Sequence, residues 1–193
     1  MPLRVIPADK LDAFGAAVRD QNWPTRIGLQ IMLYCGLRVG EICKLCWDDL
    51  LTGARPKAAL TVPRYAAKRH AERTIPIPRP LADEILTPIE YHYRPQNLSP
   101  ANYLTAHTHG GKGYSTRHFQ RVCENIGAQI GLDYLTPHTL RHTYADRLRR
   151  VTDLTVVQQA LGHKRLSTTA IYAHPTLDEL TAATTKLYPG VTA

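Results

Sequence analysis

The sequence predicts a mainly α-helical protein with a small antiparallel β-sheet, which is an α+β fold. Apolar residues recur at helical spacing in several segments that are opened by Pro, Ser or Thr and closed by Gly. Short apolar and β-branched runs at 58–62 and 74–77 flank a polar segment and predict a hairpin. Because 193 residues suffice for one good-sized core, we expect a single domain over residues 1–193.

The composition favours a globular protein that binds a polyanion. Hydrophobic residues make up 44% of the chain and charged residues 21%, and no apolar run approaches the length of a membrane span. The first residues lack a signal-peptide pattern, so we expect a cytoplasmic protein. The formal net charge of +8 favours nucleic acid as the partner.

The cysteines are expected to be reduced thiols of an intracellular chain. Cys43 and Cys46 have the spacing of half a zinc site, but no second pair lies at ligand spacing. We therefore interpret them as small apolar residues in a helix and expect no metal site.

Two helices are predicted at the N-terminal end, at 8–20 and 24–35. Gly36 ends the second helix, and its permissive backbone would allow Arg38 to project from the start of the next helix. Glu41 follows Arg38 by one helical turn. Taken alone, these two residues could be a surface ion pair that contributes under about 1 kcal/mol.

The predicted sheet comprises residues 47–50, 58–62 and 74–77, with a polar hairpin tip over 64–72. The tip and its border are strongly basic, with the residues Arg64, Lys68, Arg69, His70 and Arg73.

Two further helices are predicted in the middle of the chain. The first spans 80–92, and the second begins after Ser115, a suitable N-cap. Lys112 lies in the basic, glycine-rich loop before Ser115. Arg117, with His118 and Arg121, would line the polar face of the second helix, and a solvated face and a DNA-facing one look alike in sequence.

The last third of the chain contains a candidate anion site. Thr136 as N-cap and Pro137 in the first turn open a helix, with His138 and Arg141 on one face of that turn. A helix N-terminus offers unpaired N–H groups, and a guanidinium matches two phosphate oxygens. Taken alone, this pair is more often an ordinary surface feature.

The combination of motifs resembles the tyrosine recombinase (phage integrase) family. The family's pattern of His-x-x-Arg, then Leu-Gly-His, then a tyrosine nine residues later, is present at 138–141, 161–163 and Tyr172. The segment from Gly36 resembles the family's first box with Arg38, and Lys68 aligns with the family's hairpin lysine. Ala67 replaces the usual glycine, so Arg64 and Arg69 remain alternative phosphate contacts. The resemblance implies the tyrosine recombinase catalytic-domain fold.

The resemblance also implies a site-specific DNA recombinase that cuts and rejoins DNA through a covalent 3′-phosphotyrosine bond, without metal, ATP or another cofactor. Tyr172 would be the nucleophile, Arg38 and Arg141 would bind the phosphate, and Lys68 would be the general acid.

The remaining site residues have assisting roles in this scheme. His138 would assist proton removal from the nucleophile, and His163 would hydrogen-bond the phosphate. Glu41 would order arginine or histidine side chains, and His142 would pack behind Arg141. Further DNA contacts are expected at Arg64, Arg69, Arg73, Lys112, Arg117, Lys164 and Arg165.

The expected partner is double-stranded DNA, on which a monomer would assemble into a homo-tetramer through the C-terminal segment 176–193. Because the first box arrives by Arg38, we expect no N-terminal core-binding domain; a catalytic-domain fragment and a short single-domain recombinase of a prokaryote, virus or mobile element both fit. Two other functions stay open: a DNA-binding regulator that no longer cuts, and relaxation of DNA like that of a type IB topoisomerase.

Overall fold

The computed structural model describes residues 4–66, 72–91, 103–106, 112–162 and 176–189. The helices are α1 (Leu11–Arg19), α2 (Trp23–Cys35), α3 (Val39–Ile42), α4 (Trp47–Leu50), α5 (Arg79–Tyr91), α6 (Thr116–Ile130), α7 (Pro137–Arg149), α8 (Leu154–Leu161) and α9 (Leu177–Leu187), and a 3-10 turn η1 (Ala8–Lys10) precedes α1. The predicted fold class, mainly helical with small antiparallel sheets, is confirmed. Across the described ranges, no helix is both long and apolar enough to cross a membrane.

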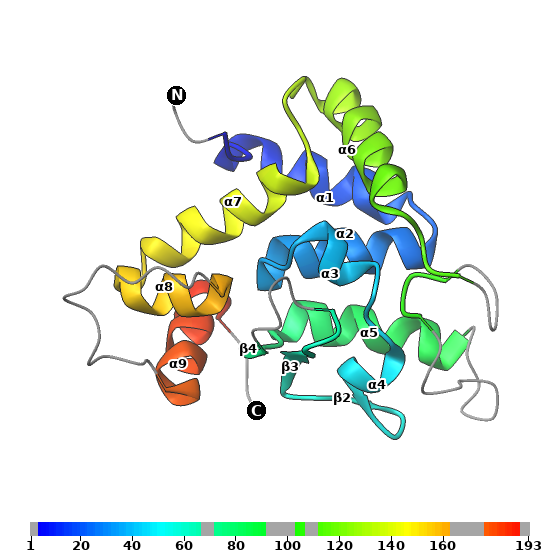
Figure 1. The fold of residues 1–193 in the computed structure, drawn as a ribbon. Coiled ribbons are helices and arrows are strands. Elements are labelled where there is room, and N and C mark those ends of the chain that lie inside the picture. The colour runs from blue at the N-terminus through cyan, green and yellow to red at the C-terminus, as the bar shows by residue number, and fades with distance from the viewer. Residues whose placement is uncertain (1–3, 67–71, 92–102, 107–111, 163–175, 190–193) are drawn as a thin grey trace.

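Helix α2 lies at the centre of the molecule. It contacts α7 on one side and α5 on the other, and α1 and α6 lie on the side of α7 (Figure 1). Ile27, Leu29 and Ile31 on α2 have no exposed surface, as expected of a helix that is covered all round. The side chain of Asn22 caps its N-terminus by accepting a hydrogen bond from Thr25 N at 3.1 Å.

The sheet structure differs from the prediction. The strands are β1 (Leu51–Thr52), β2 (Arg55–Pro56), β3 (Ala59–Val62) and β4 (Arg73–Pro76), and they form two separate antiparallel pairs, β1 with β2 and β3 with β4. Residues 47–50, predicted as a strand, form the helical turn α4, because the Asp49 carboxylate accepts a hydrogen bond from Cys46 N at 2.8 Å and stabilises a helix start. The predicted hairpin of β3 and β4 is present, with Leu60 opposite Ile75.

The predicted caps of the two later helices are present. Ser115 Oγ accepts from His118 N at 3.3 Å at the start of α6, and Thr136 Oγ1 accepts from Thr139 N at 3.2 Å at the start of α7. The capping of α7 places His138 in its first turn.

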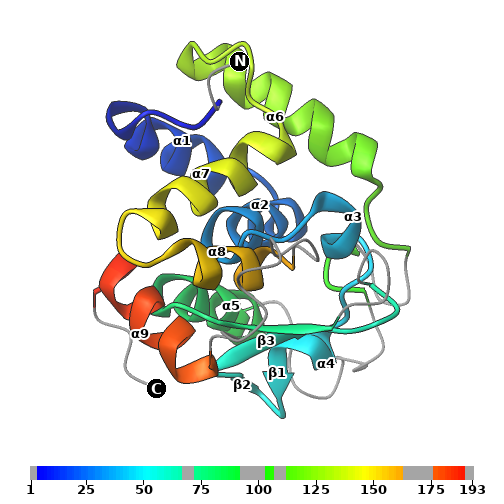
Figure 2. The ribbon, with the colours of Figure 1, turned by 60° about the vertical axis from the view of Figure 1, so that its left-hand side comes forward.

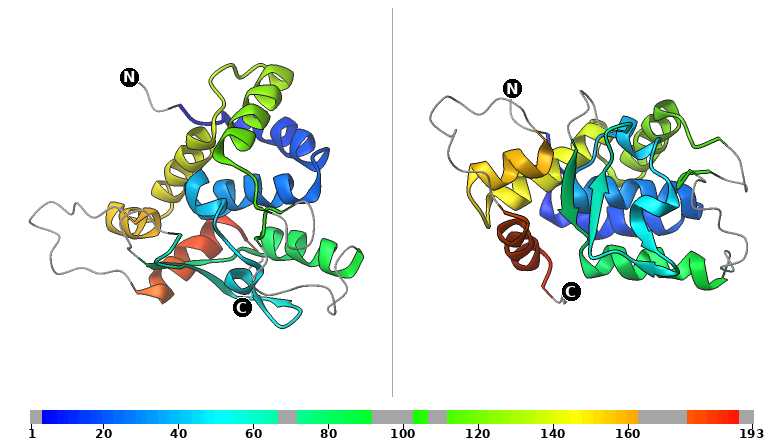
Figure 3. Two further views of the ribbon diagram at one scale, coloured as in Figure 1. Left: turned by 45° about the vertical axis from the view of Figure 1, so that its right-hand side comes forward. Right: turned by 60° about the horizontal axis from the view of Figure 1, so that its bottom comes forward.

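The C-terminal helices form a second apolar cluster. Helix α9 packs against β4, α7 and α8 of its own chain, and Leu180 and Ala183 are buried there beside Tyr144. Figures 2 and 3 show α8 and α9 beside the β3–β4 hairpin, at the opposite end of the molecule from α6. Leu177, the first residue of α9, is 46% exposed. The apolar face of α9 formed by Leu180 and Ala183 therefore packs against its own chain.

Gly36 ends α2 in the left-handed conformation, with φ at 65°, and lies directly against α7. A Cβ added there would come closer to the ring of Tyr144 than any real contact. Gly53, with φ at 60°, has open space around it. We expect Gly53→Ala to lower the free energy of unfolding by about 1–2 kcal/mol, the cost of a left-handed alanine.

Gly36→Ala should lower the free energy of unfolding by about 1–3 kcal/mol more than Gly53→Ala does, because the buried ring of Tyr144 must also move. Urea unfolding of both variants measures the difference, and equal losses would show that the close approach has no energetic consequence.

Candidate active site

Arg38 and Glu41 lie together at the start of α3, directly after the left-handed end of α2. The Glu41 carboxylate accepts hydrogen bonds from Arg38 N at 2.8 Å and from Arg38 Nη1 at 3.2 Å. The side chain of Arg38 is 27% exposed, whereas that of Glu41 is 2% exposed. Glu41 therefore holds both the backbone N–H and the guanidinium of Arg38 from the protein interior, while part of the guanidinium faces solvent.

Arg73 approaches the same carboxylate from the first residue of β4. Its Nη1 and Nη2 atoms donate to the two oxygens of Glu41 at 2.9 and 2.8 Å, a bidentate pair, and its Nε donates to the backbone oxygen of Ala160 at 3.0 Å. The prediction that Arg73 belongs to an exposed basic tip and binds DNA is not supported by this geometry. The side chain is buried because β4 pairs with β3 and places position 73 opposite Val62, facing Glu41.

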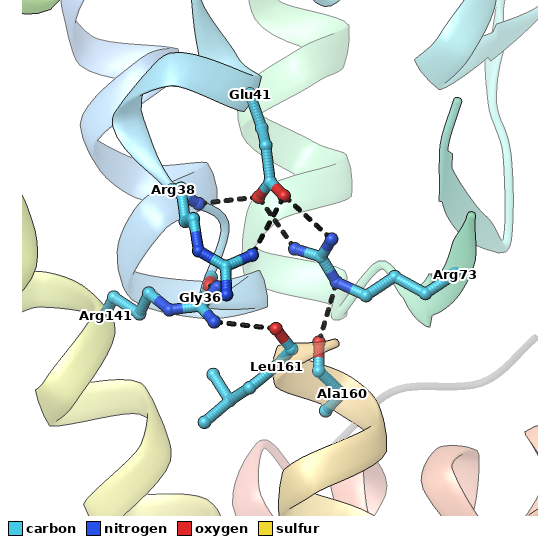
Figure 4. Close-up of polar contacts among 7 residues, drawn as sticks. All are labelled: Gly36, Arg38, Glu41, Arg73, Arg141, Ala160 and Leu161. Atoms are coloured by element: carbon cyan, nitrogen blue, oxygen red, sulfur yellow. Dashed lines mark hydrogen bonds and ion pairs between the residues drawn. The ribbon is translucent and has the colours of Figure 1, made fainter. Parts of the chain in front are cut away.

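Arg141 enters the cluster from α7. It donates from Nη1 to the backbone oxygen of Gly36 at 2.5 Å and from Nη2 to that of Leu161 at 2.6 Å. Figure 4 shows the guanidinium groups of Arg38, Arg73 and Arg141 directed toward one another between the start of α3 and the end of α8. The last carbonyls of α8, which have no partner within the helix, thus accept hydrogen bonds from two arginines.

The cluster has an excess of positive charge. Among the described residues, the cluster holds three guanidinium groups and one carboxylate, that of Glu41, which pairs with Arg38 and Arg73. Burial acts to raise the pKa of Glu41, but the hydrogen bonds and charges of Arg73 and Arg38 outweigh it and hold the pKa below its usual value. Burial, together with the charges of Arg38 and Arg73, lowers the pKa of Arg141 to about 9, so it stays protonated at neutral pH. Cations held this far from water favour a bound anion.

The family model of the phage integrase family matches residues 4–179 of the chain. The chain belongs to this family. The tyrosine recombinase XerA of Pyrococcus furiosus is 34% identical over 182 residues, which cover 94% of this chain and 56% of that protein. The tyrosine recombinase XerD of Listeria innocua is 34% identical over 152 residues, which cover 77% of this chain and 49% of that protein. The chain thus spans about half the length of the relatives it matches.

The fold matches that of solved phage integrase family proteins. The integrase from mycobacterium phage Brujita superposes with a TM-score of 0.71 at 18% identity, covering all of this chain and 60% of that one.

The two histidines of α7 both lie at the surface. His138 lines a pocket of about 460 Å³ with Val39, Arg117 and Arg121, between α3, α6 and α7. His142 was expected to pack behind Arg141, and this is wrong: its side chain is exposed. The physical reason is the position of His142, one turn after His138 on the outer face of α7, with the ring centroids 6.5 Å apart.

The other predicted contacts fall into two groups. Arg64, Lys112 and Arg117 are exposed, as a DNA contact requires. The remaining predicted residues lie outside the described part of the chain, namely Lys68, Arg69, His163, Lys164, Arg165 and Tyr172. Strand β4 follows the segment that contains Lys68, and helix α8 precedes the segment that contains Tyr172. These two described elements contact each other.

The cysteines and acidic residues form no metal centre in the described ranges. No group of three or more His, Cys, Asp or Glu side chains there could hold a metal ion. Cys35 and Cys123 are buried, and Cys43 and Cys46 are half-buried free thiols.

Sequence reasoning missed the role of Arg73 as the second partner of Glu41. A signal was present, because Arg73 is the first residue of the buried strand β4, where an inward-facing charge needs a buried partner. Glu41 is such a partner, but it lies 32 positions before Arg73, so no local sequence pattern links the two residues.

Proposed function

We propose that the chain cuts and rejoins double-stranded DNA at specific sites, through a covalent 3′-phosphotyrosine intermediate. The observation that carries this proposal is the cluster of Arg38, Arg73 and Arg141 with Glu41 as its one carboxylate, which leaves positive charge for a phosphate. Family membership supports it, since the relatives it matches are tyrosine recombinases.

In the proposed reaction the hydroxyl oxygen of Tyr172 attacks the scissile phosphorus, and the bond from phosphorus to the 5′ oxygen breaks. Arg38 and Arg141 neutralise the nonbridging oxygens, which carry more charge in the transition state. The proton of Tyr172 leaves with the help of His138, and Lys68 donates a proton to the departing 5′ oxygen. A second 5′ hydroxyl can reverse the same step without ATP, because the phosphotyrosine bond keeps the energy of the broken bond.

His163 is proposed to donate a hydrogen bond to the phosphate, and Glu41 to hold Arg38 in place. The position of His138 supports its role, since it is exposed in the first turn of α7 and borders a pocket that opens to solvent. No role in the reaction is proposed for His142.

The proposed DNA-binding surface includes the basic edge of that pocket. Arg117 and Arg121 on α6 line it together with His138, and Arg64 and Lys112 are exposed elsewhere. Arg69, Lys164 and Arg165 are proposed to extend this surface. XerH recombinase, 23% identical, with a TM-score of 0.65 over 95% of this chain and 55% of that one, was crystallised bound to its difH substrate. Phosphate contacts of this kind make affinity fall with salt.

Strand exchange between two duplexes requires four active sites, so we propose that the protein is a monomer in solution and a homo-tetramer on DNA, joined through residues 176–193. The inner face of α9 packs on its own domain through Leu180 and Ala183. Docking onto a neighbouring protomer would therefore use the outer face with the exposed Leu177, or the residues after Tyr188.

The experiment that tests the function is incubation with a duplex nicked next to the cleavage site, so that the cut end is lost and the intermediate accumulates. We expect a protein–DNA adduct that withstands denaturing electrophoresis and forms in EDTA without ATP. Binding without adduct would contradict the proposal and indicate a regulator. An adduct that leads only to relaxation of a supercoiled plasmid, with no exchange between two sites, would indicate a topoisomerase.

A further inference from the structure

Arg73 joins three segments that are far apart in the sequence. Its Nη1 and Nη2 atoms bind both oxygens of Glu41, and its Nε binds the backbone oxygen of Ala160. These bonds engage all three guanidinium nitrogens of Arg73 within the protein. We infer that Arg73 is a positioning residue, which sets the guanidinium of Arg38 for contact with phosphate by holding the carboxylate that the two arginines share. The inference rests on the proposed function.

Each oxygen of Glu41 binds both arginines. Oε1 accepts from Arg38 Nη1 at 3.2 Å and from Arg73 Nη1 at 2.9 Å, and Oε2 accepts from Arg38 N and from Arg73 Nη2, both at 2.8 Å. Arg73 thus has the shorter side-chain contacts and occupies both oxygens. Without it, Arg38 would be the only described cation that is hydrogen-bonded to the buried carboxylate, which would draw that guanidinium inward, away from the phosphate.

Arg73 is itself held from the opposite side. The bond from Nε to Ala160 fixes it to the last turn of α8, and Gly162 closes that helix with φ at 64°. A Cβ added at Gly162 would lie 3.0 Å from Arg73 Cδ, so the stem of Arg73 passes close to the glycine backbone. The guanidinium of Arg73 therefore binds Glu41 from a side chain that is itself held in place at the end of α8, as a positioning group requires.

Lysine at position 73 keeps the charge but lacks the planar fork, so it cannot bind both Glu41 oxygens and Ala160 at once. A misplacement of a reacting group by roughly 1 Å lowers rates about 100-fold. We therefore expect Arg73→Lys to lower single-turnover cleavage about 100-fold while DNA affinity stays unchanged, because the guanidinium nitrogens of Arg73 bind groups within the protein.

The deciding test compares two nicked substrates, one with the natural scissile phosphate and one with a methylphosphonate at that position. The methyl group replaces a nonbridging oxygen and removes its charge, so correct placement of Arg38 matters less. With this substrate we expect Arg73→Lys to lose under about 10-fold relative to wild type. Arg79→Lys is the matched control, since Arg79 is exposed and pairs with Asp83 on α5. It should leave both rates unchanged.

Equal losses on the two substrates would overturn the inference, because a merely structural defect lowers both alike. Unchanged cleavage of the phosphate substrate would also overturn it. Absence of an adduct with the wild-type protein would contradict the proposed function instead.

If thermal unfolding shows that Arg73→Lys does not fold, the paired change Glu41→Gln with Arg73→Gln replaces it. This pair removes both charges and leaves no unpaired buried carboxylate. We again expect a smaller loss of cleavage on the methylphosphonate substrate than on the phosphate substrate. Equal losses on the two substrates would again overturn the inference.

Discussion

Tyr172→Phe is expected to abolish formation of the covalent protein–DNA adduct and to leave DNA affinity nearly unchanged. The substitution removes the oxygen that attacks phosphorus, and no group of similar nucleophilicity replaces it at the same position. Affinity depends mainly on cationic contacts with phosphates, to which a neutral hydroxyl adds little. Denaturing electrophoresis of the nicked-substrate reaction and a binding titration at fixed salt measure the two quantities.

The structure explains why other tyrosines should not substitute for Tyr172. Burial raises the pKa of Tyr144 well above its usual value, and its ring lies against Gly36 inside the protein. Tyr188 is also buried, with its hydroxyl 3.5 Å from the backbone oxygen of Leu33. Tyr134 donates a hydrogen bond to the backbone oxygen of Val5. Adduct formation by Tyr172→Phe would place the nucleophile elsewhere and contradict the proposed mechanism.

Arg141→Ala is expected to lower single-turnover cleavage by at least about 100-fold, because loss of a charged donor to the transition state costs roughly 3 kcal/mol. It should also lower the free energy of unfolding by about 1–3 kcal/mol, because buried carbonyls lose their donor. These carbonyls are those of Gly36 and Leu161.

Arg38→Ala is the matched comparison. It removes a partly exposed guanidinium whose described side-chain hydrogen bond goes to Glu41, and Glu41 keeps Arg73 as its partner. We expect a similar loss of cleavage with a smaller change in unfolding free energy. Unimpaired cleavage in either variant would show that its guanidinium does not contact the scissile phosphate.

The parts of the site that depend on local sequence signals could be predicted. Thr136 and Pro137 determine where α7 begins, and Gly36 determines where α2 ends, so the placement of Arg141 and Arg38 at helix starts follows from a few neighbouring residues.

The parts that depend on long-range packing could not be predicted. The contact between Arg73 and Glu41 arises only when the β3–β4 hairpin folds back onto α3. His142 was predicted to lie inward. Its actual outward position depends on which face of α7 covers α2, and the local sequence does not show this. Residues 47–50 are helical because Asp49 caps the turn, a local signal that the strand prediction did not take into account.

The most direct test of the account is to identify the residue that carries DNA in the adduct. After reaction with the nicked substrate, the adduct is digested with trypsin and nuclease and analysed by mass spectrometry. Cleavage after Arg165 and Lys186 releases the peptide 166–186, in which Tyr172 is the only tyrosine. The account predicts a nucleotide joined through its 3′ phosphate to Tyr172 in this peptide. A nucleotide on any other peptide, or attached through a 5′ phosphate, would contradict it.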